Sequence, residues 1–400
     1  MTALAVLRQP PFRRYFLASV CGVNGMWIFR VLLSWSAWAE TGSAAFVGLV
    51  AALSLAPVAL TGPVFGTLID RVSVRRAFVV VSGMLMLCPI AFTALAAADA
   101  LGEAPLLALA LFFGLAASAY HPVRQSLGPR LVEGPGIASV VALSALNFNV
   151  GRVISPALGG MLIAGAGVAP AGAISAALFV PNLAVIATLA PRPLAARARA
   201  GFLSEMAEGA RAAAARPAAR VAMLMAAVAL GPIRALSEVL PLLADGIHGR
   251  GAEGLGLMTS CIGAGALVAA VLQTASIGSI AGRGRMTAGA AAIGFAGGLG
   301  MVWAPWFELA AAAGLLCGFA SAFLAVQLQA GVQADLPDEL RGRVMSLWML
   351  CVTLSTSALA LAVSVGAGLV GLPLSQSAVM AAGAGLVLAG ELRARARGRG

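Results

Sequence analysis

The sequence predicts an all-α membrane protein whose twelve transmembrane helices form two six-helix bundles. Hydrophobic residues make up 60% of the 400-residue chain and charged residues only 10%, well below the roughly 25% charged residues of a soluble domain. Apolar runs long enough to cross a hydrocarbon core of about 30 Å recur from end to end. Basic residues gather in alternate connections between these runs, which indicates a fixed orientation in a membrane.

The apolar runs are counted as twelve spans. In chain order they cover residues 15–38, 46–69, 78–98, 105–121, 140–165, 171–189, 221–243, 255–280, 287–303, 307–328, 344–370 and 375–389. The N-terminal stretch has no short apolar core followed by a small-residue cleavage site. We therefore expect the first helix to be retained rather than removed as a signal peptide.

The basic residues are arginines, since the sequence has no lysine. They fall at the N-terminus, in the even-numbered connections and at the C-terminus, with four exceptions: Arg30, Arg152, Arg234 and Arg250. This positive-inside bias places both termini in the cytoplasm and supports an even number of helices. The net charge of +11 then reflects orientation and anionic membrane lipids, and nucleic-acid binding is not expected.

The longest polar stretch, residues 191–220, divides the chain into an N-terminal bundle (1–190) and a C-terminal bundle with a basic tail (221–400). Several of its apolar residues share one helical face: Phe202, Leu203, Met206 and Ala210. A short amphipathic helix on the inner membrane surface fits this spacing. A solvated linker is the alternative.

The two halves repeat each other. The second run ends in "GTLIDR", from Gly66 to Arg71, and the eighth in "GSIAGR", from Gly278 to Arg283, with Gly282 in the place of Asp70. Parallel six-helix repeats imply two bundles related by an axis along the membrane normal, with a cavity where they meet. This arrangement favours transport.

Two motifs resemble the major facilitator superfamily, in particular its bacterial drug and siderophore exporters, typified by the enterobactin exporter. The first is similar to the superfamily's loop 2–3 signature: Gly66, Asp70, Arg71, Arg75 and Arg76. The second is similar to the antiporter signature GxxxGPxxGG, with serine where a glycine is usual: Gly151, Arg152, Ser155, Pro156, Gly159 and Gly160. Serine is still small enough for close helix packing.

The resemblance covers nearly the whole chain and implies a monomeric secondary transporter of a bacterial inner membrane. It would export a small organic solute (siderophore-like, an organic anion or a drug) by alternating access, with proton antiport as one means of coupling. The loop 2–3 residues would form a cytoplasmic gate, in which Asp70 accepts hydrogen bonds at a facing helix N-terminus. Alternatively, the cluster only anchors the loop in the cytoplasm.

Ionisable residues inside the membrane are functional candidates because burying them is costly. Arg30, Arg152, Arg234 and Glu238 lie inside the runs. Arg234 and Glu238 are four residues apart on one helical face, so Glu238 either takes up and releases a proton, forms a permanent pair with Arg234, or belongs to an outer gate. The net positive interior favours anionic solutes.

The remaining candidates have two interpretations each. Arg30 lines the cavity or snorkels outward, and Arg152 bonds Asn149 or contacts substrate. Polar residues of the first and fifth runs contact substrate or hold helices together: Asn24, Trp27, Ser34, Asn147 and Asn149.

Other chemistry is not expected. The five cysteines (Cys21, Cys88, Cys261, Cys317 and Cys351) lie singly in apolar runs as packing residues, and His121 and His248 are expected at opposite membrane faces, so no metal site is predicted. The sequence has no GxxxxGK phosphate loop, no cofactor is expected, and enzymatic activity is not predicted. Uptake or facilitated diffusion of an organic anion by the same fold, or a non-transporting sensor or assembly protein, are the alternatives.

Overall fold

The computed structural model describes residues 3–69, 72–132, 136–192, 202–275, 283–333 and 336–397. Within them, twelve helical segments are long and apolar enough to cross a membrane, which confirms the predicted all-helical class and number of spans. The chain forms two compact units, residues 1–41 with 56–202 and residues 42–55 with 203–400.

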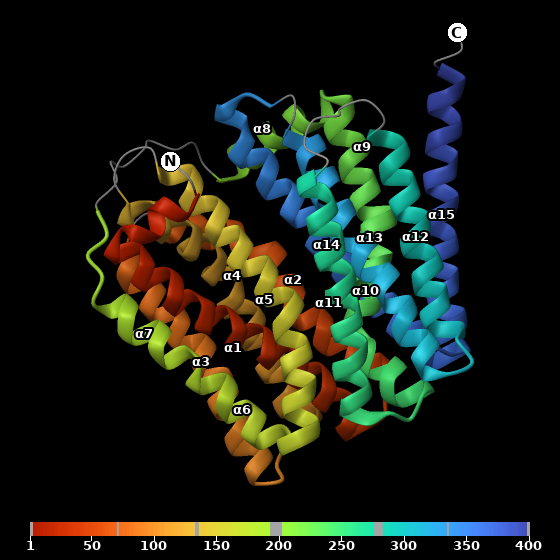
Figure 1. The fold of residues 1–400 in the computed structure, drawn as a ribbon, viewed down its shortest axis with the longest axis horizontal. Coiled ribbons are helices and arrows are strands. Elements are labelled where there is room, and N and C mark those ends of the chain that lie inside the picture. The colour runs from red at the N-terminus through yellow and green to blue at the C-terminus, as the bar shows by residue number, and fades with distance from the viewer. Residues whose placement is uncertain are drawn as a thin grey trace. The chain divides into compact units, whose positions relative to one another are not determined.

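The first unit contains the first six spans, shown from red to yellow-green in Figure 1. The starting residues of α2 belong to the second unit. In chain order its elements are η1 (Ala3–Arg8), α1 (Pro10–Thr41), α2 (Ala44–Ile69), α3 (Val74–Ala97), α4 (Glu103–Leu127), η2 (Gly128–Leu131), α5 (Ile137–Ala166), α6 (Val168–Ala177) and α7 (Phe179–Ala187).

The second unit contains the linker helix and the last six spans. Its elements are α8 (Phe202–Ala214), α9 (Pro217–Met225), the π-helical η4 (Ala226–Leu230), α10 (Gly231–Glu238), the π-helical η5 (Leu242–Ile247), α11 (Gly251–Ala275), α12 (Arg283–Trp303), α13 (Phe307–Gln333), α14 (Asp338–Val370) and α15 (Leu372–Arg397).

Prolines divide the sixth and seventh spans. Pro181 cannot donate to the carbonyl of Ala177, four residues earlier, and the helix is interrupted between α6 and α7. Pro232 likewise leaves the carbonyl of Val228 without its helical donor, inside the π-helical segment η4. This carbonyl lies against Gly383 of α15, where a side-chain Cβ would clash with it. Glycine at 383 therefore allows α15 to pack on the irregular turn.

The two units repeat the same helix pairings. In the first unit α1 packs on α5 and α3 packs on α6; in the second, α10 packs on α14 and α12 packs on α15. Gly167 joins the fifth and sixth spans with φ = 86°, and Gly371 joins the eleventh and twelfth with φ = 84°. A positive φ favours glycine. The same turn in both units supports the internal repeat read from the sequence.

The fourth span differs most from its predicted bounds. It runs from Glu103 to Leu131, whereas the apolar run was predicted to end at residue 121. The prediction followed hydropathy, which falls at His121 and Arg124, but both residues lie within α4. The predicted end of this span at residue 121 was therefore too early, while the position of His121 at a membrane face stays a prediction.

The linker stretch contains a helix, α8, which agrees with the predicted short helix rather than with a solvated linker. Of the residues 206–214, whose side chains the structure describes, Gly209, Ala212 and Ala213 are buried, whereas Ala210 of the predicted apolar face is exposed. Gly209 contacts the backbone of Arg343 at the start of α14, and a carboxylate oxygen of Glu208 lies 2.5 Å from a guanidinium nitrogen of Arg343. Protein contacts therefore orient α8.

Candidate functional site

A half-buried face of α1 carries most of the polar candidates. Asn24, Trp27 and Ser34 are half-buried, while residues between them, such as Val23 and Phe29, are fully buried. The spacing of three and seven residues places Asn24, Trp27 and Ser34 on one side of the helix. The rest of α1 forms the core of the first unit and fixes the position of this face.

Helix α5 packs closely on this part of α1 through its small residues. A Cβ at Gly151 would lie 2.5 Å from Cγ1 of Val23, and one at Gly159 would lie 3.3 Å from Cβ of Val31. Between them, the fully buried Ser155 donates a hydrogen bond of 2.7 Å from Oγ to Oδ1 of Asn24. The serine that departs from the antiporter signature therefore links α5 to α1.

The other members of the helix 5 motif have separate surroundings. Gly160 is buried, Arg152 is half-buried, and Pro156 cannot donate to the carbonyl of Arg152 four residues earlier. Asn149 is exposed, and its Nδ2 donates to the carbonyl of Ala145 in its own helix.

Asn147 is buried, and its Nδ2 donates to Oγ of Ser19 on α1 at 3.2 Å. This bond matches the prediction that Asn147 holds helices together.

A group of aromatic and basic side chains converges next to this face, and we call it the aromatic–arginine cluster. The guanidinium of Arg30 lies 5.2 Å from the ring centroid of Trp27, in the range of a cation–π interaction. Phe148 of α5 contacts Trp27 edge to face at 5.6 Å and His121 of α4 at 4.9 Å. Arg124 lies 4.7 Å from the centroid of Phe148.

Hydrogen bonds fix Arg124 within the cluster. The Nη1 of Arg124 donates to the carbonyl of Ser144 at 2.9 Å. The backbone carbonyl of Arg124 accepts a hydrogen bond of 3.1 Å from the hydroxyl of Tyr15. Arg124 is only 5% exposed. The buried indole Nε1 of Trp27 has no hydrogen-bond partner in the described part of the chain.

Phe148, His121 and Arg124 were missed by the sequence analysis. His121 and Arg124 are three residues apart on α4, a spacing that places them on one helical face. That spacing could have indicated them if the fourth span had been continued beyond its last strongly apolar residue. Phe148 gave no signal, since a phenylalanine in an apolar run is ordinary.

In the second unit, Arg234 and Glu238 lie on α10 and are both half-buried. Glu238 is the last residue of α10 and of the seventh span. Beside them, the fully buried Gln376 of α15 donates from Nε2 to the carbonyl of Pro232 at 3.3 Å. Pairing of Arg234 with Glu238 stays a prediction.

The loop 2–3 motif is only partly described. Gly66 lies near the end of α2, and Arg75 and Arg76 lie in the first turn of α3. Nη1 of Arg75 donates to the carbonyl of Leu189 at 3.2 Å, just beyond the end of α7. Asp70 and Arg71 lie outside the described residues, so the gate stays a prediction.

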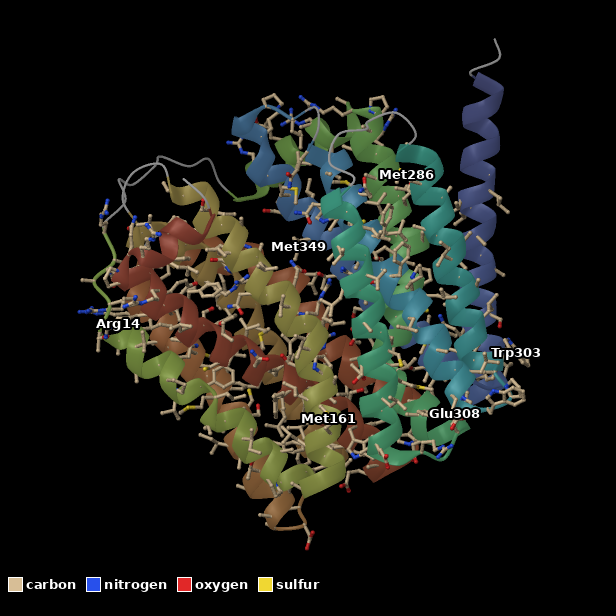
Figure 2. The ribbon with its side chains drawn as sticks, in the orientation of Figure 1. Arg14, Met161, Met286, Trp303, Glu308 and Met349 are labelled. Carbon is tan, nitrogen blue, oxygen red and sulfur yellow. The ribbon has the colours of Figure 1, made fainter. Side chains whose placement is uncertain are left out.

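A separate charged group lies on the connections around η5 and α13. Arg250 donates to Glu308 at 2.8 Å, and the rings of His248 and Phe307 lie 5.8 Å apart. Burial lowers the pKa of His248 below its ordinary value. Trp303 and Glu308 mark this end of α12 and α13 in Figure 2.

The described residues contain no group of three His, Cys, Asp or Glu side chains that could hold a metal ion. All five cysteines are free thiols.

The fold is that of major facilitator transporters. The chain is similar to a solved peptide transporter, POT, in complex with sulfate (TM-score 0.74, 14% identity, covering 100% of this chain and 99% of that one). It is also similar to the nucleoside transporter NupG (0.71, 12%, 95% and 98%) and to the human organic anion transporter MFSD10 (0.65, 19%, 94% and 98%). At these identities the likeness shows the fold alone.

The family described as transmembrane secretion effector has a model that matches residues 1–398, and the chain belongs to this family of major facilitator transporters. None of the curated proteins matches it. The resemblance to the superfamily is thereby confirmed, and the chain is a multi-pass membrane transporter. The narrower resemblance to drug and siderophore exporters stays a prediction.

Proposed function

We propose that this protein exports a small organic anion across a bacterial inner membrane by alternating access, with both termini in the cytoplasm. The aromatic–arginine cluster carries the proposal. It combines two guanidinium groups, an unpaired indole donor and three aromatic rings on α1, α4 and α5. Such a surface suits a planar or conjugated anion, since arginine pairs with carboxylates and rings stack on aromatic faces.

The distribution of carboxylates also supports a negatively charged substrate. The acidic residues among the described part of the first unit are Glu40, Asp99 and Glu103, at the ends of α1, α3 and α4. His121 follows Glu103 by 18 residues, about 27 Å along an ideal helix. None of these carboxylates is therefore placed to neutralise the cluster. Among the described residues of the first unit, a cationic drug would therefore meet arginines rather than carboxylates beside the cluster.

The first test is a ligand screen on the purified protein. Aromatic carboxylates, catecholate and hydroxamate siderophores and quaternary ammonium drugs would be compared by their effect on the melting temperature, since a bound ligand stabilises according to its occupancy. We expect anions to raise the melting temperature and cations not to. Stabilisation by the cations alone would contradict the proposed substrate class.

The second test is transport of the stabilising solute in vesicles of defined orientation. We expect accumulation in inside-out vesicles, and a loss of at least about tenfold in Arg30→Gln, which corresponds to about 1.4 kcal/mol. Arg13→Gln is the matched control because Arg13 is an exposed arginine of the same helix. Accumulation only in right-side-out vesicles would indicate uptake instead. Binding without flux in either orientation would indicate a sensor or assembly protein.

A further inference from the structure

A pocket of about 440 Å³ lies at one end of the first unit, away from the aromatic–arginine cluster. Its polar lining is Gln9, Arg130 and Arg192, and its apolar lining includes Pro10, Pro11 and Leu131. The first span begins at Pro10 and the fourth ends at Leu131. The pocket therefore lies at the ends of two membrane-crossing helices.

The two arginines of the pocket are joined through their backbones. The N–H of Arg192 donates to the carbonyl of Arg130 at 3.1 Å. The side chain of Arg130 has its Nε buried with no hydrogen-bond partner among the described residues. A buried donor left unpaired is unfavourable, because it has lost its hydrogen bonds to water. A ligand that supplies an acceptor oxygen in the pocket would remove this cost.

Further arginines surround the same end of the unit. Arg14 donates to Oγ1 of Thr188 at 3.0 Å, and Arg75 donates to the carbonyl of Leu189. Figure 2 shows Arg14 projecting outward beside α7. Glu40 lies thirty residues after Pro10 on α1, about 45 Å away along an ideal helix. The described carboxylates of the first unit lie at the ends of α1, α3 and α4, whereas the described side chains around the pocket are mainly basic.

The surroundings of the pocket indicate an anion with an apolar part. Leu17, seven residues after Pro10 and therefore on the same face of α1, is 60% exposed. The apolar lining of the pocket thus continues onto an exposed apolar surface of a membrane-spanning helix. Basic pockets between membrane helices bind the headgroups of anionic lipids. We infer that this pocket binds the phosphate of an anionic phospholipid, whose acyl chains lie along α1.

The test uses the full-length protein in detergent, titrated with phosphatidylglycerol or phosphatidylcholine, with bound lipids counted by native mass spectrometry. The pocket variant is Arg130→Gln with Arg192→Gln. The matched control is Arg211→Gln with Arg220→Gln, which removes the same charge from exposed arginines of the second unit. We expect the pocket variant to raise the apparent Kd for phosphatidylglycerol at least tenfold and the control less than twofold.

Equal losses in the two variants would overturn the inference, because they would show attraction by net charge alone. Equal affinity of the wild-type protein for phosphatidylcholine would overturn it too. Ala190→Phe fills the pocket without removing charge, and Ala190 is exposed, so the fold should tolerate it. We expect this variant to lose the lipid as well, and unchanged binding would exclude the pocket as the site.

Competition with inorganic phosphate distinguishes a site for a phospholipid headgroup from a site for free phosphate. We expect millimolar phosphate neither to displace phosphatidylglycerol nor to raise the melting temperature, because it lacks the apolar part of the ligand. If phosphate displaced phosphatidylglycerol and raised the melting temperature as much as the lipid does, the pocket would be a site for free phosphate. That result would overturn the lipid assignment.

Discussion

At the scale of single residues, the contact between α1 and α5 depends on the missing side chain of Gly151. A Cβ there would lie 2.5 Å from Cγ1 of Val23, and valine cannot relieve the clash easily because its χ1 is stiff. We expect Gly151→Ala to lower the stability by about 1–3 kcal/mol, the usual cost of overpacking a core. Thermal unfolding in detergent would measure the loss.

Two further variants test whether the clash is the cause. Gly165→Ala lies on the same helix in open space and should leave the melting temperature within about 1 °C of wild type. Val23→Ala combined with Gly151→Ala removes the clashing methyl groups and should recover much of the loss. A loss that persists in the double variant would show that the backbones of α1 and α5, rather than Val23, limit the approach.

The sequence predicted the small residues of this contact but not the site beside it. Gly151, Ser155 and Gly159 follow one another at intervals of four residues, so their shared face is local information. Phe148, His121 and Arg124 meet only because α4 and α5 pack together. Hydropathy also ended the fourth run at His121, since it averages over neighbours and cannot register that Arg124 is hydrogen-bonded and buried.

At the scale of elements, α8 is held against α14 by Gly209 and the Glu208–Arg343 pair. Both side chains are partly exposed, so the pair contributes at most about 1 kcal/mol. We expect Glu208→Arg or Arg343→Glu alone to speed amide hydrogen exchange in α8 about fivefold, as the helix opens locally more often. The double charge swap should return exchange close to the wild-type rate.

The pair of Arg250 and Glu308 gives a matched control because it is also an exposed ion pair of the second unit. Reversing those two charges should leave exchange in α8 unchanged. Faster exchange in α8 after that reversal would mean that surface charge in general, and not this contact, holds the helix.

The elements themselves were largely predictable, and the exceptions have a common cause. Twelve spans follow from apolar run length, which hydropathy measures directly. The breaks before Phe179 and within Ala226–Leu230 were not predicted, because a proline inside an apolar run hardly changes hydropathy. Pro181 and Pro232 act through the hydrogen bond they cannot make. Proline alone does not predict a break, because Pro122 and Pro156 lie inside the continuous helices α4 and α5.

At the scale of the whole molecule, the two repeats are alike in helix pairing but not in sequence. Their sequences differ in charge, because Gly282 stands where Asp70 stands in the first repeat. Within the described spans, the cluster of the first unit is arginine-rich, while Arg234 of the second unit has Glu238 one turn away on α10. This difference leads us to propose, as part of the export mechanism above, that substrate binds in the first unit and that coupling lies in the second.

Glu238 decides whether protons drive the cycle. If its carboxyl group carries the coupled proton, Glu238→Gln should abolish transport against a substrate gradient, because the amide cannot change protonation, while counterflow of substrate continues. Glu308→Gln is the matched control, since this carboxylate is exposed and paired with Arg250, and it should retain uphill transport. Proteoliposomes with an imposed proton gradient would measure both activities.

A second variant separates coupling from structure. Glu238 ends α10 at the break before η5, so it could instead anchor Arg234 and fix the two segments. In that case Glu238→Gln leaves an arginine in an apolar setting, which is costly, and adding Arg234→Gln should restore uphill transport. If Glu238 carries the proton, the double variant stays uncoupled, because removing Arg234 does not supply a titrating group. Full uphill transport by Glu238→Gln alone would exclude both roles.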